Sequence, residues 1–295
     1  HELEDRLEEA QKEARAAKRQ FDNAVEERDA VKNVIQGYQL RMDARKKKWE
    51  QSKDALMKLR MEENALISRI KLLTEMEKDH EGYTRAVKLV MGEAQRGALH
   101  NIFGPVADLL KVPDPYTVAI ETALGMAMQN IVVGQEADGK AVIQYLKRRD
   151  GGRATILPLS SIRPGFLREG PELTQEPGFV GIGDQLISFD PKFKHVFSNL
   201  LGRVVVMEHL DAAIAVARKY RYSFRIVTLD GQILNPGGSM TGGSASRSAG
   251  ILSRANELER LNQQLTGIQN RVAEGVRVVA ESERESTAAA YELET

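Results

Sequence analysis

The sequence contains no cysteine, so neither a disulfide framework nor a thiolate metal site is available to it. It has no run of about 18 apolar residues and no signal-peptide pattern, so we expect no membrane partner and a cytoplasmic location. No charge of either sign dominates, because 42 lysines and arginines balance 42 aspartates and glutamates. The net charge therefore gives no indication of nucleic acid binding, and any contact with DNA must come from a local patch.

Proline and glycine are nearly missing from the two ends of the chain. All nine prolines lie between Pro105 and Pro236, and all of the 24 glycines except Gly37, Gly267 and Gly275 lie between residues 82 and 250. Stretches without either residue favour long helices, so the chain divides into arm, globule and arm. We expect an N-terminal arm at 1–80, a first lobe at 81–164, a linker at 165–179, a second lobe at 180–250 and a C-terminal arm at 251–295.

The arms carry the apolar pattern of a coiled coil. Apolar residues recur at alternating spacings of four and three from Leu3 to Leu73, and more weakly from Leu258 to Leu293. The non-apolar positions of the first seam up to residue 77 are Arg28, Arg45, Ser52, Glu63 and Glu77. Because the arms flank one globule, an antiparallel return of the chain buries both seams most simply.

The arms differ in length, so their pairing is incomplete. About 44 residues of the second arm face the end of the first, and about 34 N-terminal residues lack a partner within the chain. These residues must fray, be stabilised by their neighbours, or pair with another molecule. We interpret the basic run Arg45–Lys48 as a solvated outer face rather than a binding site.

The pattern of the globule predicts two similar halves, each with both helices and strands. The first half predicts a helix over 116–124, a strand over 130–133, a helix over 136–148 and a strand over 154–157. The segment Asp108–Tyr116 matches Asp184–Lys192, and Ile131–Val133 matches Val204–Val206. We therefore expect an α+β fold, an internally duplicated two-lobed domain inserted at the end of an antiparallel intramolecular coiled coil.

A glycine-rich stretch, Asn235–Ser244, closes the globule just before the second arm. Such glycines permit positive φ or the close approach of another backbone. The spacing imitates a phosphate-binding loop, but Gly243 stands where that loop needs lysine. Three alternatives remain: a phosphate site, a flexible exit loop, or contact with another chain. We predict contact with a second copy of the chain through the following residues: Gly237, Gly238, Met240, Gly242 and Gly243.

The sequence Pro236-Gly237-Gly238-Ser239-Met240-Thr241-Gly242-Gly243 resembles the glycine signature of the hinge of SMC (structural maintenance of chromosomes) proteins, in its prokaryotic homodimeric form. The resemblance covers about residues 81–250 and extends to the arms. It implies a hinge that joins two SMC chains into a ring or V-shaped dimer in the nucleoid and contacts DNA weakly during chromosome condensation and segregation. The ATPase heads of that family have no motif in this chain. Alternatives are a nucleotide-binding coiled-coil protein that uses the glycine loop, and an SMC-like DNA repair protein.

The remaining polar residues predict no enzyme activity, no metal site and no cofactor, because the five histidines are scattered without a ligand pattern. A basic cluster ends the helix over 136–148, and we predict that it binds DNA: Lys147, Arg148, Arg149 and Arg153. The alternative is that these cations cap the helix C-terminus. The second half offers two further sets: Lys192, Lys194 and Arg203, and Arg218, Lys219 and Arg221. Since aromatic residues make up only 5% of the chain, we expect no sequence-specific recognition.

Overall fold

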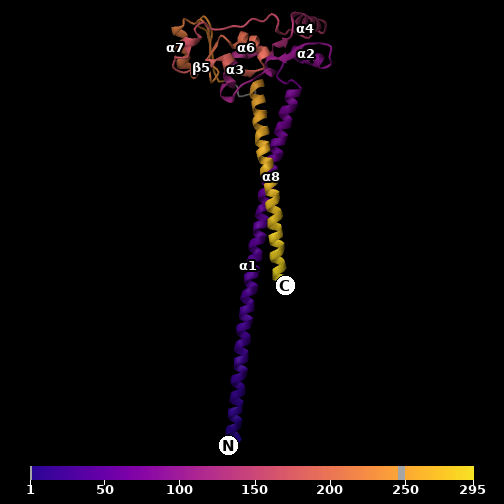
Figure 1. Cartoon of the computed structure of the whole chain (residues 1–295), viewed down its shortest axis with the longest axis vertical. Coiled ribbons are helices and arrows are strands. Elements are labelled where there is room, and N and C mark those ends of the chain that lie inside the picture. The colour runs from indigo at the N-terminus through magenta and orange to yellow at the C-terminus, as the bar shows by residue number, and fades with distance from the viewer. Residues whose placement is uncertain (1, 245–249) are drawn as a thin grey trace. The chain divides into compact units, whose positions relative to one another are not determined.

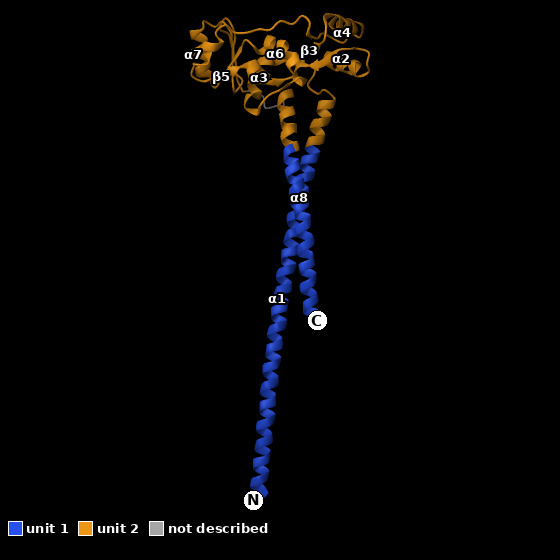
Figure 2. Cartoon of the chain, in the orientation of Figure 1, with its two compact units in different colours: residues 1–69, 263–295 blue, residues 70–262 orange. Residues whose placement is uncertain are grey.

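The computed structural model describes residues 2–244 and 250–295 (Figure 1). The chain forms two compact units, of which unit 1 comprises residues 1–69 and 263–295 and unit 2 comprises residues 70–262 (Figure 2). Two long helices, α1 (Glu2–Lys78) and α8 (Ile251–Glu294), each contribute to both units. None of the helices in the described ranges is long and apolar enough to cross a membrane.

Unit 1 is an antiparallel pair of helices, as the two seams predict. Arg41 contacts Glu292 at 3.2 Å, and the hydroxyl groups of Ser52 and Ser282 lie 2.8 Å apart. Further toward the N-terminus, apolar side chains of the α1 seam are exposed rather than packed against other described residues. Leu3 is 82% exposed and Phe21 is 68% exposed. The predicted unpaired N-terminal stretch is therefore confirmed within the described chain.

Unit 2 contains two lobes with the same topology, as the sequence repeat predicts. In lobe 1, β1 (Ile102–Pro105) pairs antiparallel with β3 (Ile131–Val133), and β3 pairs parallel with β4 (Ile156–Pro158). In lobe 2 the same pattern is made by β5 (Phe179–Ile182), β7 (Val204–Met207) and β8 (Arg225–Thr228). Both β1 and β5 are interrupted by a register shift. The α+β duplication is thus confirmed strand by strand.

The helices repeat in the same order, and in each lobe one of them, α4 or α7, is the crossover that joins the two parallel strands. Lobe 1 has α3 (Thr117–Leu124) and α4 (Glu136–Arg148), and lobe 2 has α6 (Lys194–Leu201) and α7 (Leu210–Lys219). Lobe 1 also has α2 (Arg85–Gln95), and the linker has the short helix α5 (Gly170–Leu173). The helix predicted over 136–148 begins and ends where expected, and the other elements predicted in lobe 1 shift by one or two residues.

Lobe 2 extends its sheet beyond the repeat. Antiparallel strands β9 (Ile233–Leu234) and β10 (Met240–Thr241) follow β8, which gives the strand order β10-β9-β8-β7-β5. The glycine-rich stretch is therefore a turn between two short strands, and part of it belongs to the sheet.

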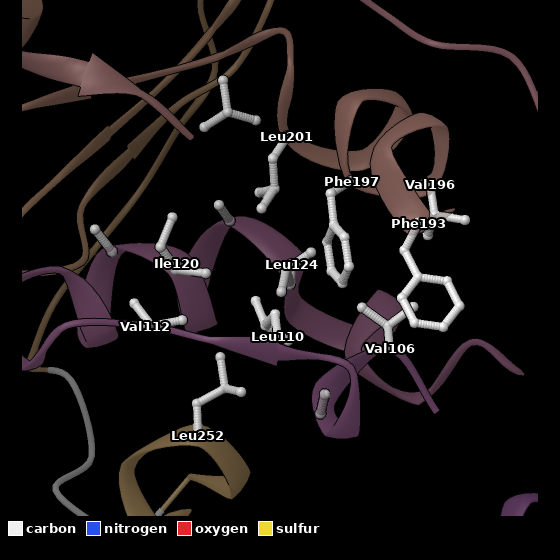
Figure 3. Close-up of a cluster of buried hydrophobic side chains, with 14 of the residues drawn as sticks. Val106, Leu110, Val112, Ile120, Leu124, Phe193, Val196, Phe197, Leu201 and Leu252 are labelled. Atoms are coloured by element: carbon white, nitrogen blue, oxygen red, sulfur yellow. The ribbon is translucent and has the colours of Figure 1, made fainter. Parts of the chain in front are cut away.

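The two lobes share one apolar core. A short ladder between β2 (Leu110–Lys111) and β6 (Ser188–Phe189) links them. Ile120 and Leu124 of lobe 1 belong to the same buried cluster as Phe197 and Leu201 of lobe 2, which Figure 3 shows. Since side chains from both halves are needed to fill this cluster, the lobes fold as one body.

Candidate dimer and nucleic-acid interfaces

The open edges of the two sheets are the first candidate surface. Lobe 1 ends in β1 and β4, and lobe 2 ends in β5 and β10. Bulges disrupt pairing at β1 and β5, whereas neither β4 nor β10 shows a register shift. Met240 is 56% exposed, and Thr241 is also exposed. Each lobe therefore offers one regular edge to which another strand can add.

The glycine-rich turn is held by its own chain. Gly237 and Gly238 have φ angles of 83° and 98°, which favour glycine without any need for a partner. The Gly237 amide donates to the carbonyl oxygen of Tyr222 at 3.0 Å, and the Gly238 amide donates to that of Asn235 at 3.0 Å. The turn conformation thus explains two glycines that the sequence alone attributes to contact with another backbone.

The second glycine pair encloses the side chain of Gln232. The Gly243 amide donates to Gln232 Oε1 at 2.8 Å, and Gln232 Nε2 donates to the Gly243 carbonyl at 3.1 Å. A Cβ atom at Gly242 would lie 2.1 Å from Gln232 Oε1. The amides of Gly237, Gly238 and Gly243 are therefore all used within the chain, which argues against a phosphate cradle in this turn.

Two residues of the predicted basic cluster of lobe 1, Lys147 and Arg153, lie beside the same hollow. Lys147, Arg148, Arg149 and Arg153 are all exposed, and Lys147 and Arg153 line one shallow hollow of about 400 Å³. None of the four forms an ion pair with another described residue, and only Arg149 has an aromatic neighbour, with its guanidinium 5.9 Å from the Tyr145 ring. No hydrogen bond joins these side chains to the last carbonyls of α4 among the described residues. Direct capping therefore does not account for them.

Several of the other predicted cations have partners. Lys219, at the equivalent helix end in lobe 2, pairs with Glu176, and this hydrogen bond lowers the pKa of Glu176. Lys192 lies 3.6 Å from Asp190. In unit 1, Arg45 and Lys48 both contact Glu285, whose pKa is lowered first by the hydrogen bond from Lys48.

A polar contact that the sequence did not predict fixes the start of α8. The Glu121 carboxylate of α3 accepts hydrogen bonds from the amides of Leu252 and Ser253 at 2.9 and 3.0 Å. Asn256 donates to the Val112 carbonyl at 2.8 Å. A carboxylate at the first turn satisfies amides that have no partner within the helix and interacts favourably with its dipole. No local signal marks Glu121, because its partners lie 131 and 132 residues away.

Each lobe also holds one aspartate at the same repeat position. Burial raises the pKa of Asp108, although a 2.5 Å hydrogen bond from the Tyr83 hydroxyl opposes the shift. Burial likewise raises the pKa of its counterpart Asp184. No group of three or more His, Asp or Glu side chains that could hold a metal occurs in the described ranges.

Comparison with known proteins places this geometry in a family. Residues 99–217 match the model of the SMC proteins Flexible Hinge Domain. The fold matches a crystal structure of an asymmetric dimer of the Geobacillus stearothermophilus SMC hinge domain, with a TM-score of 0.74 and 40% identity. The match covers 83% of this chain and 98% of that one. The chain belongs to the SMC hinge family.

The curated SMC relatives are much longer than this chain. The Chromosome partition protein Smc of Desulfitobacterium hafniense is 40% identical over 200 residues, which is 67% of this chain and 17% of that protein. The Bacillus subtilis protein of the same name is 33% identical over 261 residues, which is 88% of this chain and 22% of that protein. The chain thus spans about a fifth of these SMC proteins, and the resemblance seen in the sequence is confirmed.

Proposed function

We propose that this chain is the homodimerisation hinge, with adjoining coiled coil, of a bacterial chromosome partition protein, and that it joins two SMC chains into a ring or V-shaped dimer. The observation that carries the proposal is the pair of regular open edges, β4 in lobe 1 and β10 in lobe 2. A solved relative is described as a hinge dimer, which supports self-association here.

Two-fold symmetry makes these two edges complementary. If β10 of one chain lies about 4.8 Å from β4 of its partner, the same contact recurs on the other side of the axis and both open edges are used. In this arrangement the turn that carries Gly237, Gly238, Gly242 and Gly243 borders the contact, and Met240 supplies apolar area. The glycines would then shape the edge strand through their backbone conformation.

A charge on the edge strand tests this arrangement. Met240→Asp should give a folded monomer, because the side chain is exposed in the single chain and a charged edge opposes strand addition. Met126→Asp is the matched control, since Met126 is also exposed, at 70%, but lies outside the sheets. Light scattering together with circular dichroism should show a monomer only for Met240→Asp. A folded Met240→Asp protein that remains dimeric would refute β10 as the contact.

We infer in addition that the hinge contacts DNA weakly and without sequence specificity through Lys147, Arg148, Arg149 and Arg153. Support comes from their exposure and lack of ion pairs, whereas Lys219 at the equivalent position of lobe 2 is neutralised by Glu176. Unpaired cations release counterions from DNA on binding, which favours association at low salt. This contact would serve chromosome condensation and segregation in the nucleoid.

Three further proposals concern enzyme activity, ATP hydrolysis and the domain boundaries. We propose that this part is not an enzyme and needs no cofactor, and that ATP hydrolysis belongs to head domains outside this chain. We also propose the five-part division with boundaries at 80, 164, 179 and 250. The compact unit 2 includes the last residues of α1 and the first of α8, which suits arms rooted in the hinge.

A further inference from the structure

The turn between β8 and β9 in lobe 2 carries a glutamine, Gln232, whose side chain the proposed function does not use. The turn is fixed from inside the lobe by Thr228, the last residue of β8, which is fully buried. The Thr228 amide donates to the Gln232 carbonyl at 2.9 Å, and the Gln232 amide donates to Thr228 Oγ1 at 2.9 Å. The Thr228 hydroxyl in turn donates to the Asp230 carboxylate. The backbone of Gln232 is therefore held in place, and its side chain extends from a fixed position.

The side chain of Gln232 takes over where the backbone pairing of β9 and β10 ends. The two strands pair through two residues each, and continuation of this register would place Gln232 opposite Gly242, but β10 ends before that pair. The side-chain amide of Gln232 instead bonds to Gly243, accepting from its amide at 2.8 Å and donating to its carbonyl at 3.1 Å. A primary amide offers a donor and an acceptor as a peptide group does, so it can replace one step of the ladder.

The absence of a side chain at Gly242 makes room for this amide. A Cβ atom added at Gly242 would overlap Gln232 Oε1, whereas a Cβ atom added at Gly243 would meet no other atom within 4 Å. Gly243 has a φ of 141°, which favours glycine for conformational reasons instead. The requirement for glycine at position 242 therefore follows from the position of the Gln232 side chain.

The beginning of β10 is held as well. The Asn235 amide donates to the Ser239 carbonyl at 2.8 Å, and Asn235 Nδ2 donates to Ser239 Oγ at 3.2 Å. Between these two attachments β10 consists of Met240 and Thr241, both exposed. A strand that is ordered before binding loses little conformational freedom on binding, which favours association. Attachment at both ends therefore prepares β10 to receive another strand.

We propose that Gln232 is a positioning residue for self-association. Its side-chain amide holds the C-terminal end of β10 in strand conformation, so that the edge is formed before the partner strand arrives. A neutral amide suits this role because Gly243 presents a donor and an acceptor at once. The inference rests on the proposed contact at β10 and adds to it a residue outside the glycine-rich stretch.

Subunit exchange in the full chain measures this role. Unlabelled and isotope-labelled dimers are mixed, and native mass spectrometry follows the appearance of mixed dimers. Gln232→Met keeps the length of the side chain and removes both hydrogen bonds to Gly243, so it should speed exchange about tenfold, since changes at an interface act mainly on dissociation. Gln175→Met is the matched control, because Gln175 is an exposed linker glutamine whose amide contacts the adjacent Thr174 at 3.4 Å. It should change the rate by less than about twofold.

The variant Gln232→Glu gives a readout that packing alone does not move. At pH 7 its carboxylate has no proton to donate to the Gly243 carbonyl, and it faces the carboxylate of Asp230, which lies 3.4 Å from Gln232 Nε2. A like charge raises the pKa of a glutamate above its ordinary value of about 4.3, so the new carboxylate should gain a proton, and with it the missing donor, between about pH 7 and pH 5. Exchange relative to the wild type should be about tenfold faster at pH 7 and should slow toward the wild-type rate at about pH 5.

The outcomes separate this inference from the proposed contact. If the wild type is a monomer, or if Met240→Asp remains dimeric, the contact at β10 is refuted and the role of Gln232 in self-association with it. If Met240→Asp is a monomer but folded Gln232→Met exchanges at the wild-type rate, the role of Gln232 is refuted and the contact stands. If circular dichroism shows that Gln232→Met unfolds, the Gln232→Glu profile decides. Equal acceleration at both pH values would refute the hydrogen-bonding role, and recovery at the lower pH would support it.

Discussion

At the residue scale, the useful distinction among the many surface cations is whether each has a partner. Lys219 and Lys192 have carboxylates beside them, whereas Lys147, Arg148 and Arg153 do not. The sequence could place all of these residues at helix ends and loops, because the helical periods were clear. It could not separate paired from unpaired cations, since Glu176 and Lys219 are 43 residues apart.

Neutralising the lobe 1 cluster should make DNA binding weaker and less salt-dependent. With Lys147, Arg148, Arg149 and Arg153 changed to alanine, the slope of log affinity against log salt should fall by roughly 0.7–0.9 for each phosphate that the variant no longer neutralises. Titrations of duplex DNA at several salt concentrations measure this slope. An unchanged slope would mean that DNA binds elsewhere, and Arg85→Ala with Lys88→Ala serves as the control.

Partial desolvation of the Asp108 carboxylate in lobe 1 should make the stability of the protein depend on pH. Because burial raises the pKa of Asp108 above its ordinary value of 3.8, its contribution to stability is fully present below the pKa of the unfolded chain and is lost as pH rises through the folded pKa. Asp108→Asn should therefore gain stability relative to the wild type as pH rises from about 4 to 7. Urea unfolding at both pH values measures the difference in the free energy of unfolding between Asp108→Asn and the wild type. A difference that does not change with pH would contradict this account.

At the element scale, long periodic segments were predictable and short strands were not. The two arms, α4 and the strand repeat follow from apolar spacing over many residues. Strands β2, β6 and β10 have two residues each, and their pairing depends on segments that only the fold brings together. Helix α5 and the Glu121 contact with α8 were missed for the same reason.

The antiparallel register of the arms can be trapped chemically. Since the hydroxyl oxygens of Ser52 and Ser282 are 2.8 Å apart, Ser52→Cys with Ser282→Cys should form a disulfide within one chain. The chain has no other cysteine, so denaturing gels and a peptide map give the answer directly. Leu7→Cys with Ser282→Cys should not crosslink within a chain. Crosslinks that form only between chains would refute the intramolecular coil.

At the scale of the whole molecule, duplication gives the hinge its means of self-association. Two lobes with one topology would place equivalent edges at opposite ends of a shared core, but the lobe 2 sheet has two more strands. The regular edge is therefore β4 in lobe 1 and β10 in lobe 2. A two-fold axis can pair β4 of one chain with β10 of its partner twice, which closes the dimer. The sequence predicted the duplication but not which strands remain open.

The most direct test of the central claim is crosslinking between these two edges. The variant Thr155→Cys with Thr241→Cys places thiols at exposed positions beside β4 and on β10 in a chain that otherwise has none. With a short bismaleimide, we predict a covalent species of twice the chain mass of 32.8 kDa, and no such species from either single variant. An uncrosslinked double variant that light scattering shows to be a dimer would contradict the account, because its two chains would then meet at another surface.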